Sequence, residues 1–247
     1  MRKRRGQVID GLVLVNKPVD WSSNQMLQRV KRLIDAQKAG HTGTLDPFAT
    51  GLLICCLGKA TKLAGKMLDA DKQYVATLKF GQETDSGDLT GVVTVDLESE
   101  FVRPSEQRLL EVLQQFVGSI TQVPPMTSAL KHKGKPLYEY ARQGIEIERQ
   151  PRQVMIHGLS LLEFDGLSAT VSVDCSKGTY IRILAQDIGR ALGVRAHLVA
   201  LKRTRIGPFR LEDAWSLQAL ESIESATEAV LGVEQLPEPY RLASMVQ

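Results

Sequence analysis

The stretch Gly40-His41-Thr42-Gly43-Thr44-Leu45-Asp46-Pro47-Phe48-Ala49-Thr50-Gly51-Leu52-Leu53 decides how this chain is interpreted. Its glycines tolerate positive φ, and its proline fixes its own φ and restricts the residue before it. The backbone is therefore expected to hold one irregular shape that presents a single carboxylate, Asp46, at a set angle. Residue types alone leave an ordinary turn as the alternative, because an acidic residue before proline is a common turn starter.

This stretch resembles the signature of the bacterial tRNA pseudouridine synthases of the TruB class, and residues 40–53 match it throughout. Other segments resemble further motifs of the same family, in the family's order, between about residue 10 and about residue 215. They are Asn16-Lys17-Pro18 with Ser22-Ser23, residues 71–74, 81–88, 122–131, 137–142, 175–182 and 201–209. Chance does not account for so many ordered segments.

The resemblance implies the pseudouridine synthase fold, an α+β domain with a bent central sheet and a catalytic cleft across it. Strands and helices alternate irregularly along the chain, which independently favours a mixed, largely antiparallel sheet flanked by helices. The expected organisation is a basic arm at residues 1–10, a catalytic domain at 11–215, and an acidic helix and tail at 216–247. The small C-terminal RNA-binding domain of the PUA type that the family usually carries is expected to be absent or truncated.

Apolar periodicity predicts the individual elements. Strands are expected at residues 8–15, 52–57, 74–80 and 91–97, and a hairpin at 158–164 and 168–175. Helices are expected after the caps at 22–24, at 61–68, after 104–105, at 179–192 and around 217–223. In the helix after 105, the residues expected on the buried face are Leu109, Leu110, Leu113, Phe116 and Val117. In the helix at 179–192, they are Ile183, Leu184, Ile188 and Leu192.

The activity implied by the resemblance is that of an isomerase, which converts a uridine in the T loop of tRNA to pseudouridine. The C1′–N1 glycosidic bond breaks, the uracil rotates, and C5 joins C1′. A carboxylate can act covalently in such a reaction, as glycosidase carboxylates do, and the resemblance assigns that role to Asp46. Attack on C1′, attack on the base and a glycal route all remain open. An isomerisation needs no redox cofactor or metal, and none is expected.

The resemblance also assigns a pocket for a base that is flipped out of the RNA. By this resemblance, Arg182 would pair with the nucleophile and lower its pKa. Tyr74 stacks on the flipped uracil, and Tyr180 and Leu201 line the pocket. His41 fills the position that the base vacates in the T loop. From residue type alone, each of these side chains would more simply be a surface, core or turn residue.

Charge is distributed unevenly around the net value of +3. Residues 211–247 carry seven acids and one base, a net charge of −6, so residues 1–210 carry +9. A basic body suits an RNA partner, because phosphate neutralisation supplies much of the affinity. Candidate backbone contacts, which could equally form a solvated face, are Lys131, Lys133, Lys135, Arg142, Arg149, Arg152, Lys202, Arg203 and Arg205. Lys17 either orients the Asp46 loop or only caps local carbonyls.

Three positions depart from the family pattern: Asp20 replaces a glycine, Ile54 a proline and Thr127 a tyrosine. A glycosidase-like hydrolase would need a second acid, and we interpret the acids at 85 and 88 as turn and cap residues. A non-catalytic RNA-binding protein would not need Asp46 together with Arg182. The motifs match the bacterial enzymes better than their guide-RNA-dependent relatives.

Composition bounds the setting of the protein. No apolar run approaches the roughly 18 residues of a membrane span, and no apolar segment follows the basic start as it would in a secretory signal. Cys55, Cys56 and Cys175 fit neither a disulfide framework nor a zinc motif, so buried reduced thiols are expected. These features predict a cytoplasmic protein. The resemblance implies that it acts on the T-arm stem-loop of tRNA, and a monomer without an obligatory protein partner is expected.

Overall fold

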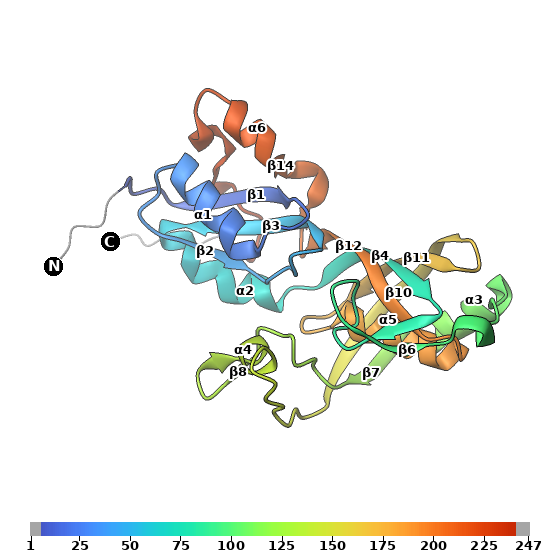
Figure 1. Ribbon diagram of the computed structural model, residues 1–247. Helices are drawn as coiled ribbons and strands as arrows, with labels where there is room; N and C mark the ends of the chain where they lie inside the picture. Colours follow the sequence, from blue (N-terminus) through green and yellow to red (C-terminus); the bar gives the residue numbers. More distant parts are fainter. Residues whose placement is uncertain (1–5, 241–247) are drawn as a thin grey trace. The chain divides into compact units, whose positions relative to one another are not determined.

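The computed structural model describes residues 6–240, and the chain forms two compact units (Figure 1). Unit 1 combines the chain up to Lys72 with the chain from Lys202 onward, and unit 2 comprises Gln73–Leu201. Residues 1–5 of the basic arm predicted at residues 1–10, and the tail from residue 241, lie outside the described residues.

Unit 1 is built around β1 (Gly11–Lys17), which pairs antiparallel with β3 (Thr50–Leu57) along its whole length. Two short strands pair with β1: β14 (Trp215–Ser216) runs parallel to it and β15 (Leu231–Gly232) antiparallel. Strand β2 (Ala39–Thr42) pairs antiparallel with β3. The second half of β12 (Ala196–Ile206) runs parallel to β3 and pairs antiparallel with β13 (Phe209–Arg210). Strand β3 is buried from Gly51 to Leu57, as its apolar sequence predicts.

Two apolar layers cover the two faces of this sheet. Alternating residues of a strand point to opposite faces, so Cys55 packs with Met26 and Val30 of α1 (Ser23–Leu33), whereas Cys56 packs with Met67 of α2 (Ala64–Asp69). Burial raises the pKa of the Cys55 thiol far above its usual range and that of Cys56 to about 12. Both thiols are free and buried, which confirms that prediction.

Helix α1 begins where the sequence predicts. The Ser22 side chain accepts from the backbone N–H of Gln25, and the Gln25 side chain accepts from that of Ser22, which forms a capping box. The helix predicted at 61–68 is a 3₁₀ turn (Gly58–Leu63) followed by α2. The last predicted helix is α6 (Leu217–Ser222), with Leu220 buried.

Unit 2 contains a sheet in the order β12-β4-β11-β10-β7. Its strands are β4 (Lys72–Phe80), β7 (Gly118–Gln122), β10 (Arg152–Phe164) and β11 (Ser168–Cys175). The predicted hairpin is β10–β11, whose turn is held by Asp165 Oδ1 accepting from the N–H groups of Leu167 and Ser168. Two small hairpins are separate: β5 (Gln82–Thr84) with β6 (Val93–Asp96), and β8 (Lys131–His132) with β9 (Lys135–Pro136).

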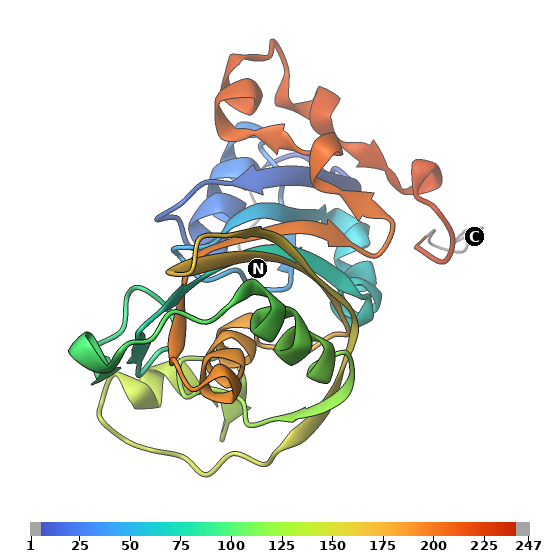
Figure 2. The same cartoon turned by 90° about the vertical axis from the view of Figure 1, so that its right-hand side faces the viewer.

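Three helices accompany this sheet: α3 (Glu106–Gln115), α4 (Leu137–Ala141) and α5 (Ile181–Leu192). Helix α3 contacts both α5 and β10 (Figure 2). Helix α5 ends at Gly193, which has the left-handed φ of +77° that glycine adopts without strain. The mixed, largely antiparallel sheet with helices confirms the predicted fold class.

The predicted buried faces of α3 and α5 are partly wrong. In α3 the buried residues are Leu109, Val112 and Leu113, whereas Leu110 is 43% exposed. Val117, 41% exposed, lies beyond the helix, because the helix ends at Gln115 and β7 begins at Gly118. In α5 the inward face includes two polar residues, which are Arg182 and Gln186, while Ile183 and Leu192 are only half-buried.

Residues 6–240 contain neither a membrane-spanning helix nor a cluster of metal ligands. No helix there combines the length and the apolar composition that crossing a bilayer requires. No group of three or more His, Cys, Asp or Glu side chains there could hold a metal ion.

Candidate functional site

Asp46 lies half-buried in the irregular segment between β2 and β3 of unit 1. The carbonyl of Asp46 accepts from the N–H of Ala49 at 3.1 Å, which closes a turn. Strand β3 then begins at Thr50, and its second residue, Gly51, has a φ of +104° and pairs with Arg203 of β12. A Cβ at Gly51 would lie 2.3 Å from the Arg203 carbonyl oxygen, so only glycine fits this approach.

Three buried side chains hold this loop. The Ser23 hydroxyl accepts from Leu45 N at 2.8 Å and donates to Leu45 O at 3.1 Å. Lys17 is fully buried, and its ammonium donates to three carbonyls, including that of Pro47 at 3.2 Å. Arg203 is 1% exposed and donates to the carbonyls of Leu52 at 2.8 Å and Gly43 at 3.0 Å. The backbone on both sides of Asp46 is therefore fixed.

These contacts show what the side chains of Lys17 and Arg203 touch within the protein. The Lys17 ammonium donates both to the nearby carbonyl of Pro18 and to that of Pro47, the residue after Asp46. Lys17 therefore caps local carbonyls and also holds the Asp46 loop. Arg203 fits the loop-orienting role and not the exposed RNA contact, because its guanidinium lies in the interior. Asp20 takes the left-handed φ of +64° that suits the family's glycine, and its N–H donates to the Pro47 carbonyl.

Burial governs the protonation of two groups near Asp46. Desolvation lowers the pKa of Lys17 to about 8, although the neighbouring carboxylates of Asp46 and Asp20 favour its charged form. Desolvation, and then the positive charge of Arg203, lower the pKa of His41. The imidazole of His41 is therefore neutral at pH 7. Its Nδ1 is buried without a hydrogen-bond partner within the described part of the chain.

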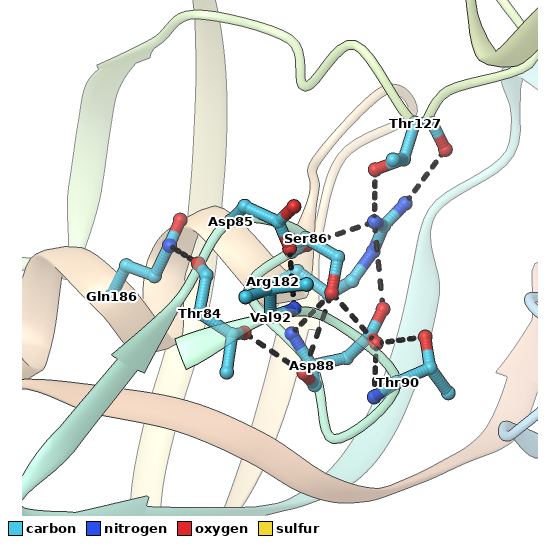
Figure 3. Close-up of polar contacts among 9 residues, drawn as sticks. All are labelled: Thr84, Asp85, Ser86, Asp88, Thr90, Val92, Thr127, Arg182 and Gln186. Carbon is cyan, nitrogen blue, oxygen red and sulfur yellow. Dashed lines mark hydrogen bonds and ion pairs between the residues drawn. The ribbon is translucent and has the colours of Figure 1, made fainter. Parts of the chain in front are cut away.

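Unit 2 holds a second polar cluster around Arg182, which is 4% exposed (Figure 3). Its Nη1 donates to the Ser86 carbonyl at 2.9 Å and to Thr127 Oγ1 at 2.5 Å, and lies 3.5 Å from Asp88 Oδ2. Its Nη2 donates to the Thr127 carbonyl at 3.1 Å. The other carboxylate oxygen, Asp88 Oδ1, accepts from the Ser86 hydroxyl and from Thr90 N and Oγ1.

The turn interpretation of Asp85 and Asp88 is confirmed, but it is incomplete. Asp85 Oδ1 accepts from Val92 N at 2.9 Å, and Asp88 organises its own turn through Thr90. Asp88 is also a buried ion partner of Arg182, a role that the sequence did not predict. The sequence carries no local signal for this pair, because α5 and the β5–β6 loop meet only in the folded unit.

Tyr180 is fixed at the start of α5. The side chain of Gln122, 1% exposed, accepts from Tyr180 N at 3.0 Å and donates to Tyr180 O at 3.2 Å. The Arg152 guanidinium lies 4.8 Å above the centre of the Tyr180 ring, a cation–π contact, and also donates to the Gly178 carbonyl. Arg152, a predicted RNA contact, thus has an intramolecular role as well.

The predicted site residues are distributed over both units. Unit 1 carries Lys17, His41, Asp46, Lys202 and Arg203, and unit 2 carries Tyr74, Lys131, Tyr180, Arg182 and Leu201. Among them Lys131 and Lys202 are exposed, Tyr74 and Tyr180 are half-buried, and Leu201 is 7% exposed.

Comparison with known proteins identifies the family. Residues 31–181 match the family model described as TruB family pseudouridylate synthase (N terminal domain). The chain belongs to the TruB family. Residues 182–238 match the model described as the tRNA pseudouridylate synthase B C-terminal domain. The family resemblance of the motifs is thereby confirmed.

Named relatives of this TruB-family chain cover nearly all of it. It is 60% identical to tRNA pseudouridine synthase B of Bordetella pertussis, over 96% of this chain and 97% of the relative. It is 56% identical to the protein of the same name from Chromobacterium violaceum, over 90% of this chain and 72% of the relative.

Solved structures of similar fold include two assemblies. A crystal structure of a Cbf5–Nop10–Gar1 complex matches with a TM-score of 0.71 and 30% identity, over 93% of this chain and 63% of that chain, so this chain spans less than two thirds of it. A structure of an H/ACA RNP bound to a substrate RNA containing 2′-deoxyuridine matches with a TM-score of 0.68 and 26% identity, over 96% of this chain and 68% of that chain.

Proposed function

We propose that this chain is a tRNA pseudouridine synthase that isomerises a uridine in the T loop of tRNA. The observation that carries the proposal is the rigid presentation of Asp46, whose flanking backbone is held by Ser23, Lys17 and Arg203. A preorganised carboxylate suits covalent catalysis at a nucleotide. The relatives named tRNA pseudouridine synthase B, which are similar over nearly the whole chain, support the substrate class.

Asp46 acts as the nucleophile in this proposal. The C1′–N1 electron pair leaves with the uracil, the base rotates, and C5 forms the new bond to C1′. The C5 proton is lost and N1 gains one, so substrate and product have the same composition. The three possible routes differ in what the Asp46 carboxylate does: it bonds to C1′, it adds to the uracil ring, or, in a glycal route, it takes a proton from the ribose.

Arg182 is proposed to pair with the Asp46 carboxylate and keep it ionised. The restraints on its guanidinium within unit 2 suit that role, because a fixed fork of donors matches a carboxylate. Arg182→Lys is therefore expected to impair catalysis more than tRNA binding. An unchanged single-turnover rate in that variant would contradict the pairing.

The remaining pocket roles are assigned by motif position. Tyr74 stacks on the everted uracil, which offsets part of the cost of flipping, since stacking a base on an aromatic ring is worth about 1–3 kcal/mol. Tyr180 and Leu201 line the pocket. His41 takes the place of the base in the T loop, and the lowered pKa of its imidazole fits an uncharged stacking group.

RNA binding is assigned to the exposed basic residues. Lys131, Lys133 and Lys135 lie on the β8–β9 hairpin with their side chains exposed, and Lys202 is exposed on β12. These ammonium groups would contact the phosphates of the T-arm stem-loop. We further propose that the protein acts in the cytoplasm as a monomer, without a metal or organic cofactor.

The decisive experiment incubates unmodified tRNA with the protein and maps pseudouridine by carbodiimide-dependent primer-extension stops. The proposal requires one stop in the T loop that Asp46→Asn abolishes, while tRNA affinity stays within about tenfold, because binding rests on many phosphate contacts. A protein that binds tRNA and leaves no stop would instead support the non-catalytic RNA-binding alternative.

A further inference from the structure

Thr127 stands where the TruB-class pattern has a tyrosine. It lies half-buried between β7 and β8. The residues around it are anchored: Pro125 and Ser128 are buried, and the Ser128 carbonyl accepts from the N–H of Tyr138 in α4 at 3.1 Å. A threonine here is therefore held in place by its own segment.

Thr127 supplies two acceptors to one guanidinium. Its hydroxyl accepts from Arg182 Nη1 at 2.5 Å, and its carbonyl accepts from Nη2 at 3.1 Å. Figure 3 shows Thr127 reaching the guanidinium from one side, while Ser86 and Asp88 reach it from the other. Because the donors of a guanidinium form a rigid planar fork, acceptors on both sides fix its orientation.

We propose that Thr127 is a positioning residue for Arg182, so that its hydroxyl sets the orientation of the guanidinium used in catalysis. This inference rests on the proposed function. The same segment continues into the β8–β9 hairpin, whose three lysines are exposed. RNA held by that hairpin would restrain Thr127, and through it Arg182, which links substrate binding to the alignment of the catalytic arginine.

The test compares Thr127→Val with Thr127→Ser. Valine keeps the shape of threonine and removes only the hydroxyl, whereas serine keeps the hydroxyl. We expect Thr127→Val to slow single-turnover pseudouridine formation at saturating enzyme by about tenfold, the order of one charge-assisted hydrogen bond. Thr127→Ser should stay near the wild-type rate, and both variants should keep the wild-type affinity for tRNA.

A double-mutant cycle shows whether the effect passes through Arg182. In an Arg182→Lys background, the bidentate geometry is already lost, so adding Thr127→Val should reduce the residual rate by much less than tenfold. Thermal unfolding of all variants identifies any that are misfolded. Independent, multiplicative losses would show that Thr127 acts elsewhere and would overturn the inference.

The rates and tRNA affinities of the single variants also test the inference. A wild-type rate in Thr127→Val would overturn the inference, as would equal losses in the valine and serine variants. A loss of tRNA affinity with an unchanged saturated rate would make Thr127 an RNA contact instead. In each case an active wild type and an inactive Asp46→Asn variant leave the proposed function standing, whereas an inactive wild type removes that function and this inference with it.

Discussion

The Ser23 hydroxyl holds both backbone groups of Leu45, accepting from its N–H at 2.8 Å and donating to its carbonyl at 3.1 Å. Leu45 directly precedes Asp46, and Ser23 is only 2% exposed. The first residue of α1 thus fixes the backbone that leads into the proposed nucleophile.

Ser23→Ala is expected to slow pseudouridine formation at least tenfold, because the loop would lose both bonds to Leu45. It should also reduce the free energy of unfolding by about 1–3 kcal/mol, since buried polar groups are left unsatisfied. Ser22→Ala is the matched control. It removes the helix cap, at a cost of about 1 kcal/mol, and leaves the Leu45 contacts intact. Equal activity losses in the two variants would argue for general destabilisation.

Asp88→Ala is expected to destabilise the protein by about 3 kcal/mol, because it removes a buried carboxylate that lies 3.5 Å from the buried guanidinium of Arg182. Urea denaturation measures this change. The comparison variant is Asp85→Ala, which removes an exposed carboxylate that accepts from the Val92 N–H. If both variants unfold at the same urea concentration, the Asp88–Arg182 pair contributes nothing particular to stability.

Lys17 should make stability depend on alkaline pH. The pKa of its ammonium is lowered to about 8 in the folded protein from 10.5 in the unfolded chain. Between these values the unfolded state binds more protons than the folded state, so the contribution of Lys17 to the free energy of unfolding rises with pH. Denaturation of wild type and Lys17→Met at pH 7.5, 9 and 10.5 should show the difference shifting towards wild type. A difference that shifts towards the methionine variant would refute the lowered pKa.

The β8–β9 hairpin should contribute to affinity and not to the chemical step. Replacing Lys131, Lys133 and Lys135 with alanine is expected to weaken tRNA binding and to lower the slope of log affinity against log salt by about 2–3, if all three contact phosphates. Gln143→Ala, a neutral exposed change beyond α4, is the control. An unchanged slope would place the RNA elsewhere.

The sequence predicted those parts of the fold that have strong local signals. Strand β3 is a continuous apolar run, and α1 combines helical spacing with the Ser22 cap. The buried face of α3 was predicted less well, because Leu109 and Leu110 are equally apolar and only tertiary packing selects between them.

In the candidate site, too, local sequence signals were predictive and long-range contacts were not. The motif around Asp46 was evident because glycines and proline constrain backbone locally. The burial of Arg203 and the partnership of Arg182 with Asp88 and Thr127 were not evident, because they join segments far apart in the sequence. From sequence alone, a charged side chain is expected to be exposed to solvent, because the acceptors that would allow its burial are not evident.

The placement of the three cysteines has a practical consequence. Cys55 and Cys56 lie in unit 1 and Cys175 lies in unit 2, all of them buried, and the chain has no others. Because only a thiolate at the surface reacts readily, an alkylating reagent should label the native protein very slowly. The number of labels acquired during partial denaturation would then report which unit opens first, two for unit 1 and one for unit 2, without any engineered probe.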